Sequence, residues 1–330
     1  MRRTFKAAVY ETHGNPAEVL RVVELPWPDP VADEVVVRMA AAPINPADLN
    51  SIEGKYPIKA PLPATPGMEG AGVVVEVGSR VRDLEVGAQV ILPHNFGTWR
   101  EVAVIAAEKL VATPPEIEPI QAAMLKVNPI TAWRMIHDFV SLKPGDWLIQ
   151  NAANSGAGEC VIQIARELGI KTVNVVRRPE LVEELYSLGG DVVLVDVENL
   201  RDEMTAATGK ASIRLALNAV GGENGLRVAK CLASDGTMVT YGAMSLQPLC
   251  IPNGMLIFKN VRFTGFWVNK WYDAATPEQR AETFAPLFEM AKRGLLRTKV
   301  EKTYPLSEAQ AAIEHASQHK RSGKIVFVLG

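Results

Sequence analysis

The segment that decides the fold runs from Trp147 to Gly158 and has the sequence WLIQNAANSGAG. Its first four residues predict a buried strand, and the small and polar residues after them predict a tight turn. Residues 159–168 then carry apolar side chains at helical spacing. This succession of strand, small-residue turn and helix is typical of the phosphate-binding turn of a dinucleotide-binding fold.

The turn departs from the G-x-G-x-x-G fingerprint, because Ala153 and Ser155 stand at the first two glycine positions. Small residues still allow the backbone to approach a pyrophosphate, and the unpaired N–H groups at a helix start attract its negative charge. The alternative is an ordinary glycine-rich turn between a strand and a helix. We expect a dinucleotide, bound by the turn residues Asn154, Ser155, Gly156, Ala157 and Gly158.

From Pro119 onward, helix-length segments alternate with short apolar runs, as in the α/β class. Six runs predict strands: Trp147–Gln150, Thr172–Val176, Val192–Val195, Leu215–Asn218, Met238–Tyr241 and Val261–Thr264. Six such strands make a complete doubly wound parallel sheet. We expect one continuous helix over Ile120–Phe139 in front of it.

The region up to residue 120 has short β-branched runs separated by Pro, Gly and Asn, which predict β structure with irregular loops. These runs are Glu34–Met39, Gly72–Val77, Ala88–Leu92 and Glu101–Ile105. Near the C-terminus, Pro277–Arg293 and Ser307–Ser317 predict helices, and Lys324–Leu329 predicts a strand that pairs with the N-terminal region. We therefore expect a catalytic domain of residues 1–120 and 266–330 and a dinucleotide-binding domain of residues 121–265.

Charge and composition exclude several classes of function. The 330 residues include 35 Lys and Arg against 37 Asp and Glu, so no basic field attracts nucleic acid or an anionic membrane. No apolar run approaches the ~18 residues that a membrane-spanning helix needs. The three cysteines, Cys160, Cys231 and Cys250, are too few and too widely spaced for a disulfide framework.

The N-terminal residues lead directly into the strand-like stretch Ala7–Tyr10, with no room for a signal or transit segment. We expect a cytoplasmic protein, or a mitochondrial one if a targeting segment has been removed.

The second predicted strand of the sheet is followed by Arg177-Arg178-Pro179. An NAD-preferring site would place an acidic residue there, whereas a guanidinium binds a 2′-phosphate through charge-assisted bonds. We expect NADPH as the cofactor, with Arg177 or Arg178 as the 2′-phosphate ligand. The alternative is a solvated basic pair after a strand.

The β-rich N-terminal region, the inserted six-strand nucleotide fold and the returning C-terminus resemble the medium-chain dehydrogenase/reductase superfamily over the full chain. This resemblance implies a GroES-like β-rich catalytic domain beside a doubly wound Rossmann domain. Zinc-dependent members carry Cys, His and Cys ligands where this chain has Asn45, Met68 and the stretch Lys126–Asn128. No soft ligand remains for zinc, so we expect no metal.

Among zinc-free members, the chain is similar to the mitochondrial-type 2-enoyl thioester reductases and to the quinone oxidoreductases. The stretches Ile44–Asp48 and Gly54–Pro57 resemble both groups. Four stretches resemble the enoyl reductases specifically: Val127–Ala132, Gln150–Gly156, Asn174–Arg177 and Gly265–Trp271. The resemblance implies NADPH-dependent reduction of trans-2-enoyl thioesters of CoA or acyl carrier protein. An NADPH:quinone oxidoreductase and a non-catalytic NADPH-binding protein are the alternatives.

The resemblance also implies roles for single residues. Tyr56 matches the catalytic tyrosine of the enoyl reductases, and a neutral phenol can donate a hydrogen bond to a developing enolate. The alternative for Tyr56 is packing in a Pro-rich loop. Asn45, Phe266 and Trp267 are candidate substrate contacts, although aromatic residues after a strand are often plain core. Further cofactor contacts are expected from Asn128, Thr131, Tyr241, Phe266 and Val268.

Other conspicuous residues have simpler interpretations. His315 and His319 lie four apart without a third ligand, and we expect both to be surface histidines. Glu69 is expected to be a structural hydrogen-bond anchor. The basic residues Lys320, Arg321 and Lys324 are expected to form a solvated end, with contact to a phosphorylated carrier as the alternative.

The predicted strand Val261–Thr264 ends the nucleotide sheet with an unpaired edge. In the superfamily that the chain resembles, two subunits pair such edges, and we expect a homodimer.

Overall fold

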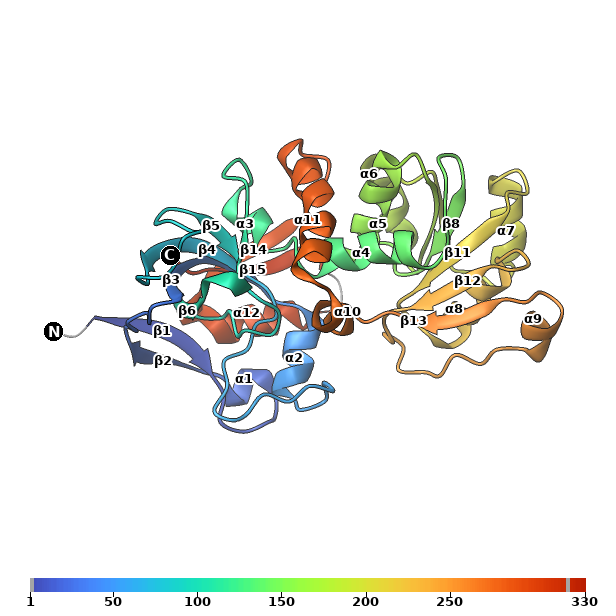
Figure 1. Cartoon of the computed structure of the whole chain (residues 1–330). Coiled ribbons are helices and arrows are strands. Elements are labelled where there is room, and N and C mark those ends of the chain that lie inside the picture. The colour runs from blue at the N-terminus through green and yellow to red at the C-terminus, as the bar shows by residue number, and fades with distance from the viewer. Residues whose placement is uncertain (1–2, 319–320) are drawn as a thin grey trace. The chain divides into compact units, whose positions relative to one another are not determined.

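The structure is a computed structural model that describes residues 3–318 and 321–330, and the chain forms two compact units (Figure 1). The first unit contains the residues up to Val127 and those from Ala285 onward, and the second is Asn128–Phe284. Both borders lie further along the chain than the expected ones at 120/121 and 265/266. The reason is that the residues in front of α4 (Asn128–Asp138) belong to the first unit, whereas α10 (Val268–Ala274) and the residues up to Phe284 belong to the second.

The second unit is built on a six-stranded sheet in the order β10-β9-β8-β11-β12-β13. The strands are β8 (Trp147–Gln150), β9 (Lys171–Val176), β10 (Val192–Val195), β11 (Ile213–Asn218), β12 (Thr237–Thr240) and β13 (Arg262–Gly265). All neighbouring pairs are parallel, which confirms the predicted doubly wound sheet.

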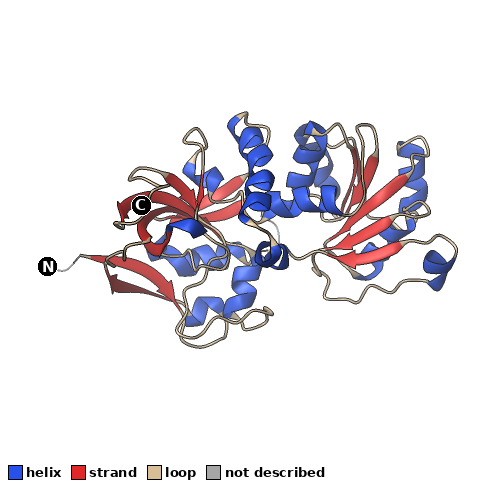
Figure 2. Cartoon of the chain, in the orientation of Figure 1, coloured by secondary structure: helices blue, strands red, loops and turns tan. Residues whose placement is uncertain are grey.

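Helices lie on both sides of this sheet (Figure 2). They are α5 (Gly156–Glu167), α6 (Val182–Leu188), α7 (Leu200–Ala207), α8 (Gly222–Lys230) and α9 (Asn253–Ile257), with α4 and α10 in the same unit. Because both faces of the sheet are covered, strands such as β8 carry continuous apolar runs, and Leu148 and Ile149 are fully buried.

The predicted helix over Ile120–Phe139 is wrong as one element. The structure has α3 (Pro119–Ala122) and α4 (Asn128–Asp138), with turns between them. Pro129 has no backbone N–H and cannot donate to the preceding turn, so it is favoured in the first turn of a helix and disfavoured in the interior of one. The spacing of the apolar residues continues across this interruption and therefore does not reveal it.

The first unit is a mixed β structure. A sheet has the order β14-β15-β3-β4-β5-β7, with β6 paired to β3, and β1 and β2 form a separate antiparallel pair. The strands are β1 (Thr4–Val9), β2 (Arg21–Pro26), β3 (Glu34–Pro43), β4 (Ala71–Val77), β5 (Gln89–Ile91), β6 (Val102–Ala106), β7 (Val111–Ala112), β14 (Val300–Pro305) and β15 (Lys324–Val328). The last strand, β15, pairs antiparallel with β3, which confirms the expected return to the N-terminal region.

The helices of the first unit are α1 (Pro16–Val19), α2 (Pro46–Ile52), α3, α11 (Pro277–Lys292, whose first turns belong to the second unit) and α12 (Ala309–Ala316). Short 3-10 turns occur at η1 (Ala107–Lys109), η2 (Pro179–Leu181, in the second unit) and η3 (Leu306–Glu308). The core gathers around Trp99 and Phe327, whose rings meet edge to face with centroids 5.1 Å apart. In the part of the chain that the structure describes, no helix has the length and apolarity to cross a membrane.

Candidate active site

The predicted phosphate-binding turn joins β8 to α5. Ser155 caps the helix, and its Oγ accepts a hydrogen bond from the Gly158 N–H at 3.1 Å. A Cβ on Gly158 would lie 2.6 Å from the Ala153 carbonyl oxygen, so only glycine allows helix and turn to approach this closely. The N–H groups of Gly156 and Ala157, the first two residues of α5, have no intrahelical acceptor and are available to an anion. The turn therefore fits a pyrophosphate, although two glycines of the fingerprint are replaced.

Tyr241 follows β12 and approaches the same turn. Burial raises the pKa of Tyr241 to about 12, while the nearby Ser155 side chain acts in the opposite direction. The Tyr241 hydroxyl is buried and has no hydrogen-bond partner among the described residues. Its backbone N–H donates to the Asn218 carbonyl at 2.9 Å. The structure thus brings a neutral phenol, predicted as a cofactor contact, to the capping residue of the turn.

The two arginines after β9 differ in their surroundings. Arg178 is half-buried and its Nη1 lies 3.6 Å from Glu180 Oε1. Arg177 is exposed and forms no ion pair with any residue that the structure describes. A guanidinium without a carboxylate partner is the better ligand for a 2′-phosphate, because no internal bond has to break.

The remaining predicted cofactor and substrate contacts of the second unit lie on α4 and directly after β13. Thr131 is buried on α4, which packs against α5, and the Asn128 Nδ2 is buried without a hydrogen-bond partner among the described residues. After β13, the Phe266 N–H donates to the Thr240 carbonyl at 3.0 Å and its ring meets Phe139 edge to face.

The two residues that follow Phe266 differ in exposure. Trp267 is 39% exposed, whereas Val268 is 8% exposed. Asn269 was not predicted as a site residue. It is buried, and its Nδ2 has no hydrogen-bond partner among the described residues.

In the first unit, Tyr56 follows α2 in a turn whose conformation is fixed by the backbone. The N–H groups of Lys55 and Tyr56 both donate to the Asn50 carbonyl, at 2.8 and 3.1 Å. Tyr56 is half-buried, and the next residues, including Ile58 at 40% exposure, are exposed. The tyrosine therefore stands at the rim of the core, not inside it.

Asn45, predicted as a substrate contact, lies at the start of α2 with 4% of its surface exposed. Its Nδ2 donates to Glu69 Oε1 at 2.9 Å, and the Lys324 ammonium donates to its Oδ1. The amide is thus held at both ends by charged groups of the protein. Lys324 is half-buried and part of this arrangement, so the expectation that it belongs to a solvated end is wrong. Its strand, β15, pairs with β3 and brings Lys324 next to Asn45.

Glu69 is fully buried and its Oε2 accepts from the Val127 N–H at 2.9 Å, which confirms the expected structural anchor. Burial raises the pKa of Glu69, whereas the Lys324 charge and the Asn45 amide oppose the rise. Lys126, also buried, donates to the Leu92 carbonyl at 2.7 Å.

Asp48 completes the group that we call the charged cluster: the buried residues Asp48, Glu69 and Lys126 with the half-buried Lys324. Its carboxylate accepts from the N–H groups of Asn45 and Met68, at 2.7 and 2.8 Å. Burial raises the pKa of Asp48 to about 7. The neighbouring His94 is affected in the opposite sense, since burial and the Lys126 charge lower its pKa to about 3. Asn45, which stands where the zinc-dependent members of the superfamily carry a metal ligand, thus lies among carboxyl and ammonium groups.

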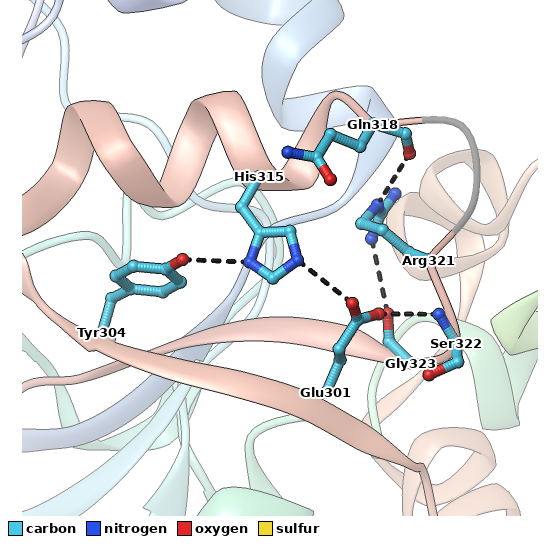
Figure 3. Close-up of polar contacts among 7 residues, drawn as sticks. All are labelled: Glu301, Tyr304, His315, Gln318, Arg321, Ser322 and Gly323. Carbon is cyan, nitrogen blue, oxygen red and sulfur yellow. Dashed lines mark hydrogen bonds and ion pairs between the residues drawn. The ribbon is translucent and has the colours of Figure 1, made fainter.

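The expectation that His315 is a surface histidine is wrong (Figure 3). Its Nδ1 shares a hydrogen bond with the Tyr304 hydroxyl at 2.9 Å, and its Nε2 lies 3.1 Å from Glu301 Oε1. Glu301 also accepts from the Ser322 N–H at 2.6 Å. The ring joins α12 to β14, a contact between elements that sequence spacing does not reveal. His319 and Lys320 lie outside the described residues.

Sequence reasoning missed Asp48, Lys126, Asn151 and Asn218 as site residues. Asn151 and Asn218 are fully buried directly after β8 and at the end of β11. Polar residues at the ends of two apolar runs were a usable signal, because the carboxyl ends of parallel strands meet at the ligand-binding edge. Asp48 and Lys126 gave no such signal, because a charge in a loop sequence does not reveal its burial.

Comparisons with known proteins agree with this geometry. Residues 31–115 match the alcohol dehydrogenase GroES-like domain, and residues 156–285 match the zinc-binding dehydrogenase family. The human mitochondrial enoyl-[acyl-carrier-protein] reductase is 43% identical over 331 residues, covering 98% of this chain and 88% of that protein.

Two solved structures match the whole fold. The Etr1p complex with NADP and crotonyl-CoA has a TM-score of 0.91 at 32% identity, covering 99% of this chain and 100% of that one. A putative NADPH:quinone reductase from Bacillus thuringiensis also has a TM-score of 0.91, at 31% identity and 99% coverage of both chains. The identity to the human protein along nearly the whole chain decides between these groups, and this chain belongs to the enoyl thioester reductases of the medium-chain dehydrogenase/reductase family.

Proposed function

We propose that this protein reduces the α,β double bond of trans-2-enoyl thioesters with NADPH and without a metal. The observation that carries the proposal is the 43% identity to an enoyl-[acyl-carrier-protein] reductase over 98% of the chain. The chain's own residues support it, since the close backbone approach at Gly158 suits a pyrophosphate and Arg177 has no carboxylate partner among the described residues.

Bound NADPH supplies the hydride that reduces the β-carbon of the substrate. The turn 154–158 would hold the pyrophosphate, and Arg177 the 2′-phosphate. Thr131 and Val268 are proposed contacts of the nicotinamide end. Their low exposure restricts water near this end, which favours transfer to the substrate.

Tyr56 is proposed as the catalytic residue. Its phenol donates a hydrogen bond to the thioester oxygen as negative charge develops there, and the proton for the α-carbon comes from the phenol or from water. Trp267 is the better candidate for an acyl contact, because it is 39% exposed whereas Phe266 packs on Phe139. Asn45 remains a proposed substrate-side residue, with an amide whose orientation is set by Lys324 and Glu69.

The direct test is an assay of NADPH oxidation, followed by absorbance, with crotonyl-CoA and longer enoyl-CoA thioesters. We expect turnover on at least one chain length, and the same substrates attached to acyl carrier protein identify the preferred carrier. Brisk quinone reduction with no enoyl turnover would establish the quinone oxidoreductase instead. NADPH binding with neither activity would indicate a non-catalytic protein.

We also propose a homodimer. β13 lies at the edge of its sheet, and the segment before it exposes apolar side chains: Met244 at 61%, Leu246 at 87%, Ile257 at 70% and Phe258 at 84%. An unpaired strand edge beside exposed apolar groups is a surface that soluble proteins cover. Light scattering at micromolar concentration should give twice the monomer mass, and a monomer would refute the proposal.

The compartment is a separate question. The human relative is named as mitochondrial, and the expectation for this chain is the cytoplasm, or mitochondria if a targeting segment is removed. Fractionation of the source cells, with detection of the protein in each fraction, tests this expectation.

A further inference from the structure

Two buried asparagines meet where the parallel sheet of the second unit changes direction. β8 leads on to β9 and β10 on one side, while β11 leads on to β12 and β13 on the other, so β8 and β11 are the neighbours at the switch point (Figure 1). In doubly wound sheets, ligands bind outside the carboxyl ends of the two strands at this point. Asn151 follows β8, and Asn218 ends β11.

The two side chains are joined across the switch point. Asn151 Nδ2 donates to Asn218 Oδ1 at 2.8 Å, and both residues are fully buried. Asn218 Nδ2 donates to Thr240 Oγ1 at 3.1 Å, which extends the contact to the end of β12. The amides therefore connect the carboxyl ends of three neighbouring strands.

The same amides hold the turn that follows β11. Asn218 Oδ1 accepts from the N–H groups of Val220 and Gly221, at 3.2 and 3.0 Å, and Asn151 Oδ1 accepts from the Ala219 N–H at 2.7 Å. Gly221 and Gly222 have φ values of +79° and +55°, a conformation that other residues rarely adopt. The turn is thus shaped by side chains on both strands and not by its own sequence alone.

The network is also anchored to α8. Asn151 Nδ2 makes a second bond to Asn224 Oδ1 at 2.6 Å, and Asn224 contacts Asp196. Asp196 forms a two-bond ion pair with Arg227, with distances of 2.7 and 2.5 Å. The side chains of Asn151 and Asn218 thus bond to each other, to the end of β12, to the turn after β11 and to the first turn of α8, all at the ligand-binding edge of the sheet.

We propose that Asn151 and Asn218 are positioning residues for the cofactor, which hold the turn 219–222 against the turn 151–158 so that the backbones of both present their polar groups to the dinucleotide. Neutral amides suit this task, because they fix backbone groups without adding a charge beneath a pyrophosphate. The two turns would contact the pyrophosphate and nicotinamide half of the cofactor, which NADPH and NADH share.

The test is direct titration of NADPH and of NADH into Asn218→Ala and Asn151→Ala, with bound cofactor followed by its fluorescence. We expect the Kd of both cofactors to rise about tenfold, as loss of buried hydrogen bonds would cause, with the ratio of the two Kd values unchanged. The KM for crotonyl-CoA at saturating NADPH should stay within about twofold, because a positioning role for the cofactor spares the thioester.

The matched control is Gln121→Leu in the first unit. Gln121 makes two comparable bonds with Thr298, Nε2 to the carbonyl at 3.0 Å and Oε1 from the N–H at 2.9 Å. This control should lose thermal stability but keep the NADPH Kd. If the asparagine variants lose stability to the same extent and bind NADPH like the wild type, the two asparagines are only structural and the proposal is overturned.

A second variant keeps the proposal testable if the buried substitutions do not fold. Asn224→Ala removes one acceptor of Asn151 from a half-buried position, and we expect about a threefold rise in both Kd values. A folded Asn224→Ala protein with unchanged affinity for both cofactors would refute the inference. All of these binding measurements are independent of whether enoyl thioesters are the substrate.

Discussion

The buried polar groups of the two units differ in charge. In the second unit, the ligand-binding edge of the sheet is organised by neutral amides, Asn151 and Asn218, which satisfy backbone groups. In the first unit, the charged cluster of Asp48, Glu69, Lys126 and Lys324 surrounds Asn45 with carboxylates and ammonium groups. An amide network does not respond to pH, whereas a cluster of buried charges depends on all its members being present and correctly ionised.

Because of this difference, we expect substitutions in the two units to affect different measurements. Changes in the first unit should affect stability, pH dependence and the chemical step. Changes in the second unit should affect cofactor binding.

The largest effect is expected from Lys324→Met. Removing the half-buried ammonium leaves the fully buried carboxyl groups of Asp48 and Glu69 without the opposing charge of Lys324. A buried charge that loses its opposing charge costs up to about 3–5 kcal/mol of unfolding free energy. Urea denaturation measures the loss. Lys109→Met, at an exposed position of η1, is the control and should be near neutral. A Lys324→Met protein as stable as the wild type would mean that the cluster does not depend on this charge.

Tyr56→Phe tests whether the first unit supplies the catalytic group. If the phenol stabilises the enolate, kcat and kcat/KM should both fall roughly 10²-fold, the scale for losing one preorganised oxyanion donor. The NADPH Kd should not change. Tyr186→Phe in the second unit is the control, because its hydroxyl accepts from the Val193 N–H at 3.3 Å and takes no part in the proposed chemistry. Activity of Tyr56→Phe within a few-fold of the wild type would remove Tyr56 from the mechanism.

Arg177→Ala tests the second unit alone. Loss of a charge-assisted bond should weaken NADPH binding by about 1.5–3 kcal/mol and leave NADH binding nearly unchanged. Arg178→Ala should have a smaller effect, since Arg178 already faces Glu180. Calorimetric titration with both cofactors measures the difference. Equal use of NADPH and NADH by the wild type would contradict the assignment.

The smallest effect concerns pH. The pKa of Asp48 is raised in the folded protein to about 7, so its contribution to stability is present below the unfolded pKa and is lost as pH rises through about 7. Wild-type stability should therefore fall relative to Asp48→Asn between about pH 4 and pH 7, by at least ~1 kcal/mol. Denaturant midpoints across this range provide the measurement, and parallel pH profiles of the two proteins would exclude the linkage.

Much of the fold was predictable, because its signals are local. The apolar run of β8, the small residues of the turn and the periodicity of α5 lie next to one another in the sequence, and the structure places them as predicted. β14 was missed, because its exposed, charged sequence has no apolar run and its pairing with β15 supplies the order. The break between α3 and α4 was missed because Pro129 interrupts hydrogen bonding without changing the apolar spacing.

Two parts of the candidate site could be predicted from the order of residues alone: the small-residue turn after β8 and the arginines after β9. The sequence also determined the absence of Cys and His at the positions where zinc-dependent relatives carry them. Tertiary structure alone decided that Lys324 reaches Asn45 across 279 positions and that Asn151 meets Asn218 across 67. The physical reason is that hydrogen bonding and burial depend on distance in space, and only strand pairing brings residues so far apart in the chain to within 3 Å of one another.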